Sequence, residues 1–107
     1  MADDIFKIEF YVPASHLESV KESLFSAGAG KVGNYDKCAW QTLGQGQFRP
    51  DSESSPFQGT ANQLETLEEY KVELVCKASN LPAVITALKK AHPYEEPAYT
   101  VIKIESL

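Results

Sequence analysis

The sequence has few cysteines and no concentrated basic segment. Cys38 and Cys76 do not form a Cys-x-x-Cys pair, which excludes the common zinc and thioredoxin-like patterns. Both lie in segments with strand-like alternation, so we interpret them as small buried residues in a reducing cytoplasm. Ten basic residues against 15 acidic residues give a net charge of −5. This charge disfavours nucleic acid as the main partner, because phosphate binding requires a concentrated basic face.

Long apolar runs are also missing. The acidic N-terminal segment 1–4 is followed by no such run, so we expect neither a signal peptide nor a membrane span, and a cytoplasmic location. The 107 residues, 43% hydrophobic and 23% charged, predict one domain over 1–107 that buries its own core. Ser15 and Ser79 belong to no nucleophile elbow, and we expect them to cap helices. No catalytic residue is therefore predicted.

An internal repeat organises the chain. Segment 6–10 (FKIEF) aligns with 70–74 (YKVEL), and 14–17 (ASHL) aligns with 78–81 (ASNL) at the same spacing. Each copy has strand alternation followed by apolar residues at helical spacing, which indicates a duplicated βαβ half. Two such halves predict an α+β, ferredoxin-like βαββαβ two-layer sandwich with antiparallel sheet order 4-1-3-2 and both helices on one face.

The expected elements follow from the turn signals. Ser15 and Glu18 fit a capping box before the first helix, and Ser79 or Asn80 caps the second. His92 precedes a proline and ends the second helix. A stretch rich in glycine and proline, about 44–63, predicts a long loop between the second and third strands, of a length that is more often functional. We expect strands at 5–12, 34–43, 66–77 and 98–104, and helices at 17–27 and 81–91.

A two-layer sandwich leaves one sheet face uncovered. The predicted core between sheet and helices is Phe6, Ile8, Phe10, Val12, Leu17, Val20, Leu24, Val72, Leu74, Val84, Ile85 and Leu88. The predicted open face carries Lys7, Glu9, Tyr11, Lys71, Glu73, Val75, Lys77, Tyr99, Val101 and Lys103. This mixture of phenols, valines and both signs of charge favours a subunit contact over a solvated face.

The segment 92–99 (HPYEEPAY) is the first candidate site. His92, Glu95 and Glu96 offer an imidazole and two carboxylates that suit a divalent metal, and such an ion is the one cofactor that the sequence suggests. The adjacent glutamates lie between prolines, which aims them in different directions, so a third ligand would come from another subunit. The alternative is that His92 caps the helix C-terminus and the glutamates are solvated or paired with lysines.

The segment 44–50 (GQGQFRP) is the second candidate. Two glycines allow backbone amides to approach an anion, and Arg49 can pair with carboxylate or phosphate. The segment opens no helix, so it is neither a dinucleotide fingerprint nor a P-loop. The alternative is a hairpin connection held down by Phe48 and Phe57. The predicted ligand-binding set is Gly44, Gly46, Phe48, Arg49 and Tyr94.

Three motifs together resemble a known family: 44–50, then 56–59 (PFQG), then 92–99. Over essentially its whole length the chain resembles the domain inserted in the middle of the bacterial NIF-three-like dinuclear-metal proteins of the YqfO type, here standing alone. That domain is similar in fold to the PII signalling proteins and CutA, so the resemblance implies a homotrimer whose sheets pack around a central axis. The family's two-metal site belongs to the flanking domains and is not carried over. PII effectors bind in subunit clefts beside the loop that corresponds to 44–63.

The sequence leaves three functions open. The favoured one is a trimeric PII/CutA-like binding or regulatory module, preferred over an enzyme, with a small molecule or metal in subunit clefts near 44–63 and 92–97. The second is a metal-assisted hydrolase with Glu95 or Glu96 as base beside an ion on His92. The third is a structural partner of a separately encoded dinuclear-metal protein.

Overall fold

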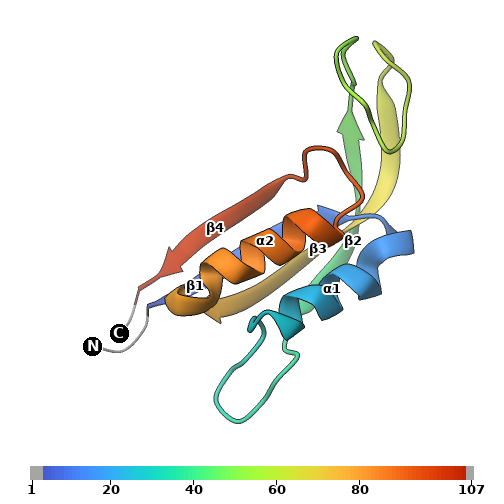
Figure 1. Cartoon of the computed structure of the whole chain (residues 1–107). Helices are drawn as coiled ribbons and strands as arrows, with labels where there is room; N and C mark the ends of the chain where they lie inside the picture. The colour runs from blue at the N-terminus through green and yellow to red at the C-terminus, as the bar shows by residue number, and fades with distance from the viewer. Residues whose placement is uncertain (1–3, 106–107) are drawn as a thin grey trace.

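The computed structural model describes residues 4–105 and has the expected βαββαβ order (Figure 1). Its four strands form one antiparallel sheet in the order β2-β3-β1-β4, which is the predicted order read from the other edge. Helices α1 and α2 lie side by side over one face of this sheet (Figure 1). The ferredoxin-like prediction is thus confirmed. The elements are β1 (Ile5–Val12), α1 (Leu17–Ser26), β2 (Trp40–Phe48), β3 (Glu65–Lys77), α2 (Leu81–Ala91) and β4 (Tyr99–Ile104).

The internal repeat is visible in the structure. Short 3₁₀ turns, Ala14–His16 and Ala78–Asn80, precede the two helices at equivalent positions. The repeated strands β1 and β3 are central antiparallel neighbours. The predicted side-chain caps by Ser15 and Asn80 are wrong, because the N-cap positions of the two helices, His16 and Asn80, make no side-chain cap hydrogen bond. The 3₁₀ turn brings the Ser15 hydroxyl to Nδ1 of His16 instead, at 2.9 Å, and the Asn80 amide donates to the Gly28 carbonyl at 3.4 Å.

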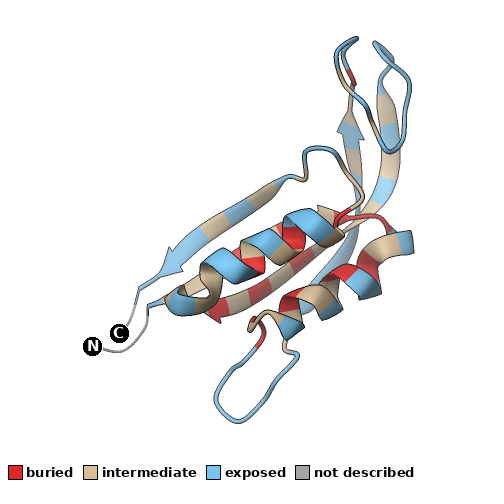
Figure 2. Cartoon of the chain, in the orientation of Figure 1, coloured by how far each residue is buried: buried red, intermediate tan, exposed pale blue. Residues whose placement is uncertain are grey.

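The core lies between the sheet and the two helices, whose facing sides hold the buried residues (Figure 2). Phe6 and Ile85 were predicted in this core but are only half-buried. Phe6 pairs with Lys103 near the open end of the sheet, where there is less cover. Cys76 is buried, and burial raises the pKa of its thiol. The buried hydrophobic residues are Ile8, Phe10, Val12, Leu17, Val20, Leu24, Ala29, Val72, Leu74, Cys76, Val84 and Leu88.

The second strand lies later in the chain than predicted. It covers Trp40–Phe48 instead of 34–43, and the loop after it runs from 49 to 64 instead of from 44 to 63. Before the strand, Lys37 has a positive φ of 53°, which a continuous strand does not allow. Gly44 and Gly46 lie inside the strand because its nine residues pair with β3 from Glu73 to Glu65. This pairing outweighs the low strand propensity of glycine.

The hairpin of β2 and β3 projects well beyond the helices (Figure 1), so the molecule is 49 Å long and only 24 Å across. Most of the hairpin's outer part is exposed (Figure 2). The 49–64 connection lies at its far end. Within residues 4–105, neither helix is long and apolar enough to cross a bilayer.

The open face of the sheet differs from the prediction at β4. Lys7 pairs with Ile102 and Glu9 with Thr100, so these β4 residues share the open face. Tyr99 and Val101, which were predicted there, pack against the core. Adjacent apolar residues at 101 and 102 allow either phase, and a shift of one residue exchanges the two faces.

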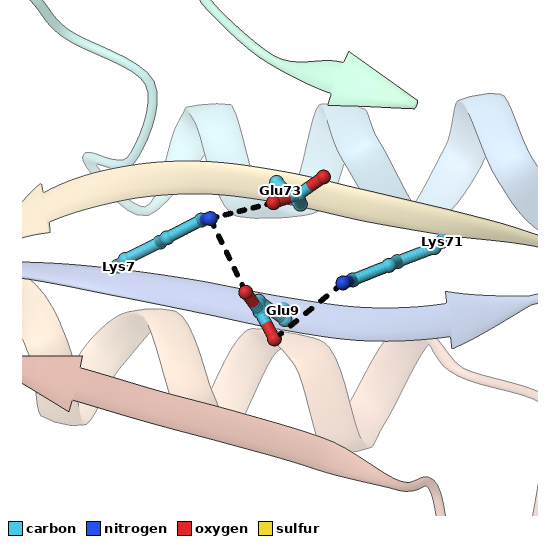
Figure 3. Close-up of polar contacts among 4 residues, drawn as sticks. All are labelled: Lys7, Glu9, Lys71 and Glu73. Atoms are coloured by element: carbon cyan, nitrogen blue, oxygen red, sulfur yellow. Dashed lines mark ion pairs between the residues drawn. The ribbon is translucent and has the colours of Figure 1, made fainter. Parts of the chain in front are cut away.

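A charge network covers the middle of this open face (Figure 3). The Lys7 ammonium contacts Glu73 and lies 3.2 Å from Glu9, and Lys71 lies 3.8 Å from the same Glu9. Hydrogen bonding from Lys7 holds the pKa of Glu73 below its usual value. Figure 3 shows these four side chains on the side of the strands away from the helices. The face therefore presents both signs of charge.

Candidate functional site

The two candidate segments come together in the structure. The backbone N–H of Ser55 donates to Oε1 of Glu95 at 2.9 Å. The Tyr94 ring lies 6.4 Å from the Phe48 ring and 6.2 Å from the Phe57 ring, between centroids. The 49–64 connection thus folds onto the segment that follows α2. Between them lies a pocket of about 510 Å³.

Most of the predicted site residues line this pocket. They are Gly46, Phe48, Arg49, Tyr94, Glu95 and Glu96. Gly44 lines a neighbouring hollow of about 460 Å³ instead. His92 is absent from both linings, because its ring is buried behind Tyr94 and is only 6% exposed.

The sequence interpretation missed several lining residues. Phe57, which the sequence predicts only to hold the loop down, lines the pocket, as do Asp51 and Tyr11, which belong to neither predicted site. Glu69 was missed as well, since it lies on β3 far along the chain from both motifs. Strand alternation from Lys71 back through Glu69 was the signal that places this carboxylate on the open face.

Both ring nitrogens of His92 are used inside the protein. Nε2 lies 2.6 Å from the Tyr11 carbonyl oxygen and must donate to it, because a carbonyl only accepts. Nδ1 accepts the backbone N–H of Tyr94 at 3.1 Å. These contacts fix the neutral ring, and burial lowers the pKa of His92 although the Tyr11 carbonyl opposes the shift. In this arrangement the ring connects the end of α2 to the end of β1 and has no lone pair left for a metal.

Metal coordination finds no further support in the geometry. Across residues 4–105, no group of three or more His, Cys, Asp and Glu side chains is arranged to hold a metal ion. Glu95 uses one oxygen to bind the Ser55 amide, and Glu96 is exposed. A metal at the 92–96 segment would therefore require the His92 ring to turn or another subunit to add ligands.

Glu69, Tyr94 and Gly46 line the pocket together. The Tyr94 hydroxyl donates to Oε2 of Glu69 at 2.8 Å. Burial and this hydrogen bond raise the pKa of Tyr94, so it is a neutral phenol at physiological pH. The Glu69 side chain passes over Gly46, where an added Cβ would overlap Oε1. At Gly44 the nearest atom to an added Cβ is 4.0 Å away, so of these two strand glycines packing requires Gly46 and not Gly44.

The lining combines aromatic rings with an excess of negative charge. Arg49 is exposed and forms no ion pair with any of residues 4–105. This one guanidinium shares the pocket with four carboxylates, those of Asp51, Glu69, Glu95 and Glu96. The lining holds no histidine or cysteine. It is suited to holding a ligand through ring contacts and charge.

Comparison with known proteins identifies relatives over nearly the whole chain. The chain is 40% identical over 97 residues to a GTP cyclohydrolase 1 type 2 homolog of Halalkalibacterium halodurans, covering 91% of this chain and 26% of the relative. Among solved structures, a Bacillus cereus protein related to NIF3 has 38% identity and a TM-score of 0.85, covering 99% of this chain and 27% of that one. No family model matches the chain.

The likeness to CutA concerns the fold alone. CutA1 from Shewanella sp. SIB1 has 17% identity and a TM-score of 0.71, covering 99% of this chain and 86% of that protein. The chain spans about a quarter of the length of the NIF3-related proteins that it matches. It is therefore a relative of one segment of the NIF3-related proteins, and this segment has the fold of CutA.

Proposed function

We propose that the chain is a subunit of a homotrimeric ligand-binding or regulatory module, and that the pocket between 49–64 and 92–97 is its binding site. One observation carries this proposal: two motifs separated by some forty residues meet around a single pocket. In addition, the Phe57 ring in this pocket is 50% exposed, although it is apolar. Such a ring is suited to contact with a ligand. In the trimer, a neighbouring subunit completes the cleft.

The open sheet face supports the assembly. Trp40 on this face is 69% exposed, and Ile102 and Ile104 are exposed beside the charge network. The outer strand β2 has nine residues without a charge or a proline. Natural edge strands usually carry a charged residue or a proline that prevents pairing with another chain. This edge and this face are therefore suited to contact with other subunits. The two free cysteines agree with a reducing compartment, and we place the module in the cytoplasm.

Light scattering tests the assembly. We expect a mass three times the 11.8 kDa of one chain. Trp40→Asp should reduce this mass, because a charge would be buried in the contact. Leu43→Asp is the matched control, since Leu43 is 52% exposed on the same strand but faces the other side of the sheet. A stable monomer for the unmodified chain would contradict the trimer.

A thermal-shift screen tests the pocket. A ligand that binds only the folded chain raises the melting temperature. Phe57→Ser should abolish the shift, whereas Leu64→Ser should preserve it. Leu64 is 60% exposed in the same connection but does not line the pocket. A shift that survives Phe57→Ser would place the ligand elsewhere.

Two other functions have less support. A metal-assisted hydrolase needs a lone pair on His92, and both ring nitrogens already have partners. Stoichiometric metal that survives purification and is lost in His92→Ala would favour it. For a structural partner of a separately encoded dinuclear-metal protein, the same open face would be the contact surface. In that case Trp40→Asp would remove binding to that protein and leave the mass of the isolated chain unchanged.

A further inference from the structure

We propose that the pocket binds a small organic cation that carries a guanidinium or ammonium group. This inference rests on the proposed function, since it names the class of ligand for the same pocket. Two separate features of the lining carry it: a wall of aromatic rings and carboxylate oxygens that are not used within the chain.

The aromatic wall consists of Phe48, Phe57 and Tyr94. Tyr94 lies between the other two, with ring centroids 6.4 and 6.2 Å away. The edge-to-face contact of His16 with Phe57, at 5.5 Å and 86°, holds the exposed ring from outside the pocket. Ring faces attract cations within about 6 Å through the electron density of the ring. A flat guanidinium can also stack on such a wall.

Each carboxylate of the lining has at least one oxygen that accepts no hydrogen bond from residues 4–105. Asp51 uses Oδ1 for the Glu53 amide, Glu69 uses Oε2 for the Tyr94 hydroxyl, and Glu95 uses Oε1 for the Ser55 amide. Within residues 4–105, the second oxygen of each accepts no hydrogen bond, and Glu96 accepts none at either oxygen. A guanidinium or ammonium can therefore form hydrogen bonds assisted by charge without displacing a contact of the chain.

An anionic ligand fits this lining less well. The amides near Gly46 were expected to approach an anion, but the Glu69 side chain lies over that glycine. An anion there would meet a carboxylate. Arg49 is the one basic residue of the lining, against four acidic residues.

A pair of probes with the same shape tests the inference on the full chain. Nα-acetyl-argininamide carries a guanidinium, and Nα-acetyl-citrullinamide carries a neutral urea in its place. In a titration followed by calorimetry, we expect the first probe to bind about tenfold more tightly than the second or better. Glu96→Gln and Phe57→Ser should each weaken it several-fold. Glu53→Gln should leave it unchanged, because Glu53 is on the same connection but outside the lining.

The other outcomes separate this inference from the proposed function. Equal binding of the two probes would overturn the cation preference. Binding of inorganic phosphate or citrate in place of the cation, weakened by Arg49→Gln and by Phe57→Ser, would overturn the inference and leave the pocket as a binding site. Absence of binding by these probes, together with no hit in the wider screen that depends on Phe57, would overturn both.

Discussion

His92 donates from Nε2 to the Tyr11 carbonyl at 2.6 Å and so joins the end of α2 to the end of β1. The same ring accepts the Tyr94 amide, which starts the segment that lines the pocket. The residue that the sequence pattern indicated as a metal ligand therefore positions Tyr94. The two hydrogen bonds of the His92 ring therefore help to position the ring of Tyr94 and the carboxylate of Glu95.

Replacing His92 should destabilise the fold. His92→Ala leaves the Tyr11 carbonyl and the Tyr94 amide without their partner, and unsatisfied buried groups cost about 1–3 kcal/mol. Urea denaturation should show a loss of this size in the free energy of unfolding. Thr86→Ala, at an exposed position of α2, is the control and should change it little. An unchanged stability in His92→Ala would contradict the role of this ring.

Stability should fall in mild acid through the same residue. Burial lowers the pKa of His92 below its ordinary 6.5, with Glu69 opposing and His16 adding to the shift. Between the folded and unfolded pKa values the unfolded chain binds the additional proton. The stabilisation is thus complete above about pH 6.5 and is lost as the pH falls towards the folded-state pKa. Urea midpoints at pH 7.5 and 5.5 measure this difference, and His92→Asn should reduce it.

The two glycines of β2 should respond differently to alanine. Gly46→Ala places a Cβ where Glu69 now lies, so the Glu69 carboxylate must move and lose the Tyr94 hydroxyl. We expect a loss of about 1 kcal/mol and weaker ligand binding. Gly44→Ala is the matched control, because its Cβ meets no atom closer than 4.0 Å. Urea denaturation measures the loss of unfolding free energy, and equal losses in the two variants would contradict this packing.

Tyr94 should ionise at higher pH than an ordinary tyrosine. Its pKa is raised by burial and by the hydrogen bond to Glu69. A spectrophotometric titration of the five tyrosines should therefore show one that resists ionisation well above pH 10 while the chain stays folded. In Tyr94→Phe this late component should vanish. Its persistence would assign the late component to another tyrosine.

The repeat made the architecture predictable. Identical spacing of the strand, the expected helix cap and the helix in both halves specified the element order, and hence the sheet order, without any knowledge of contacts. The predicted core followed from strand alternation and helical spacing. The prediction that Phe6 is fully buried was wrong, because a sequence pattern does not show where along a strand the packing of the helices ends.

The site was predictable only in part. Arg49, Tyr94 and Glu95 stood out through local motifs. Glu69 lies outside both motifs and reaches the pocket through the pairing of β3 with β2. Gly44 and Gly46 suggested a turn because glycine has a low strand propensity. They lie in a strand because β2 pairs with β3, and the sequence around them does not show this pairing. The role of His92 depended on Tyr11, which is 81 residues away.

The most direct test of the central claim is a map of amide chemical shifts on the isotopically labelled chain during titration with Nα-acetyl-argininamide or another pocket ligand from the screen. The account predicts changes concentrated at 46–58, at Glu69 and at 94–98, with Leu64 and the outer face of α2 unaffected. Changes concentrated elsewhere, such as the groove between α1 and α2 at Glu22 and Lys90, would contradict it.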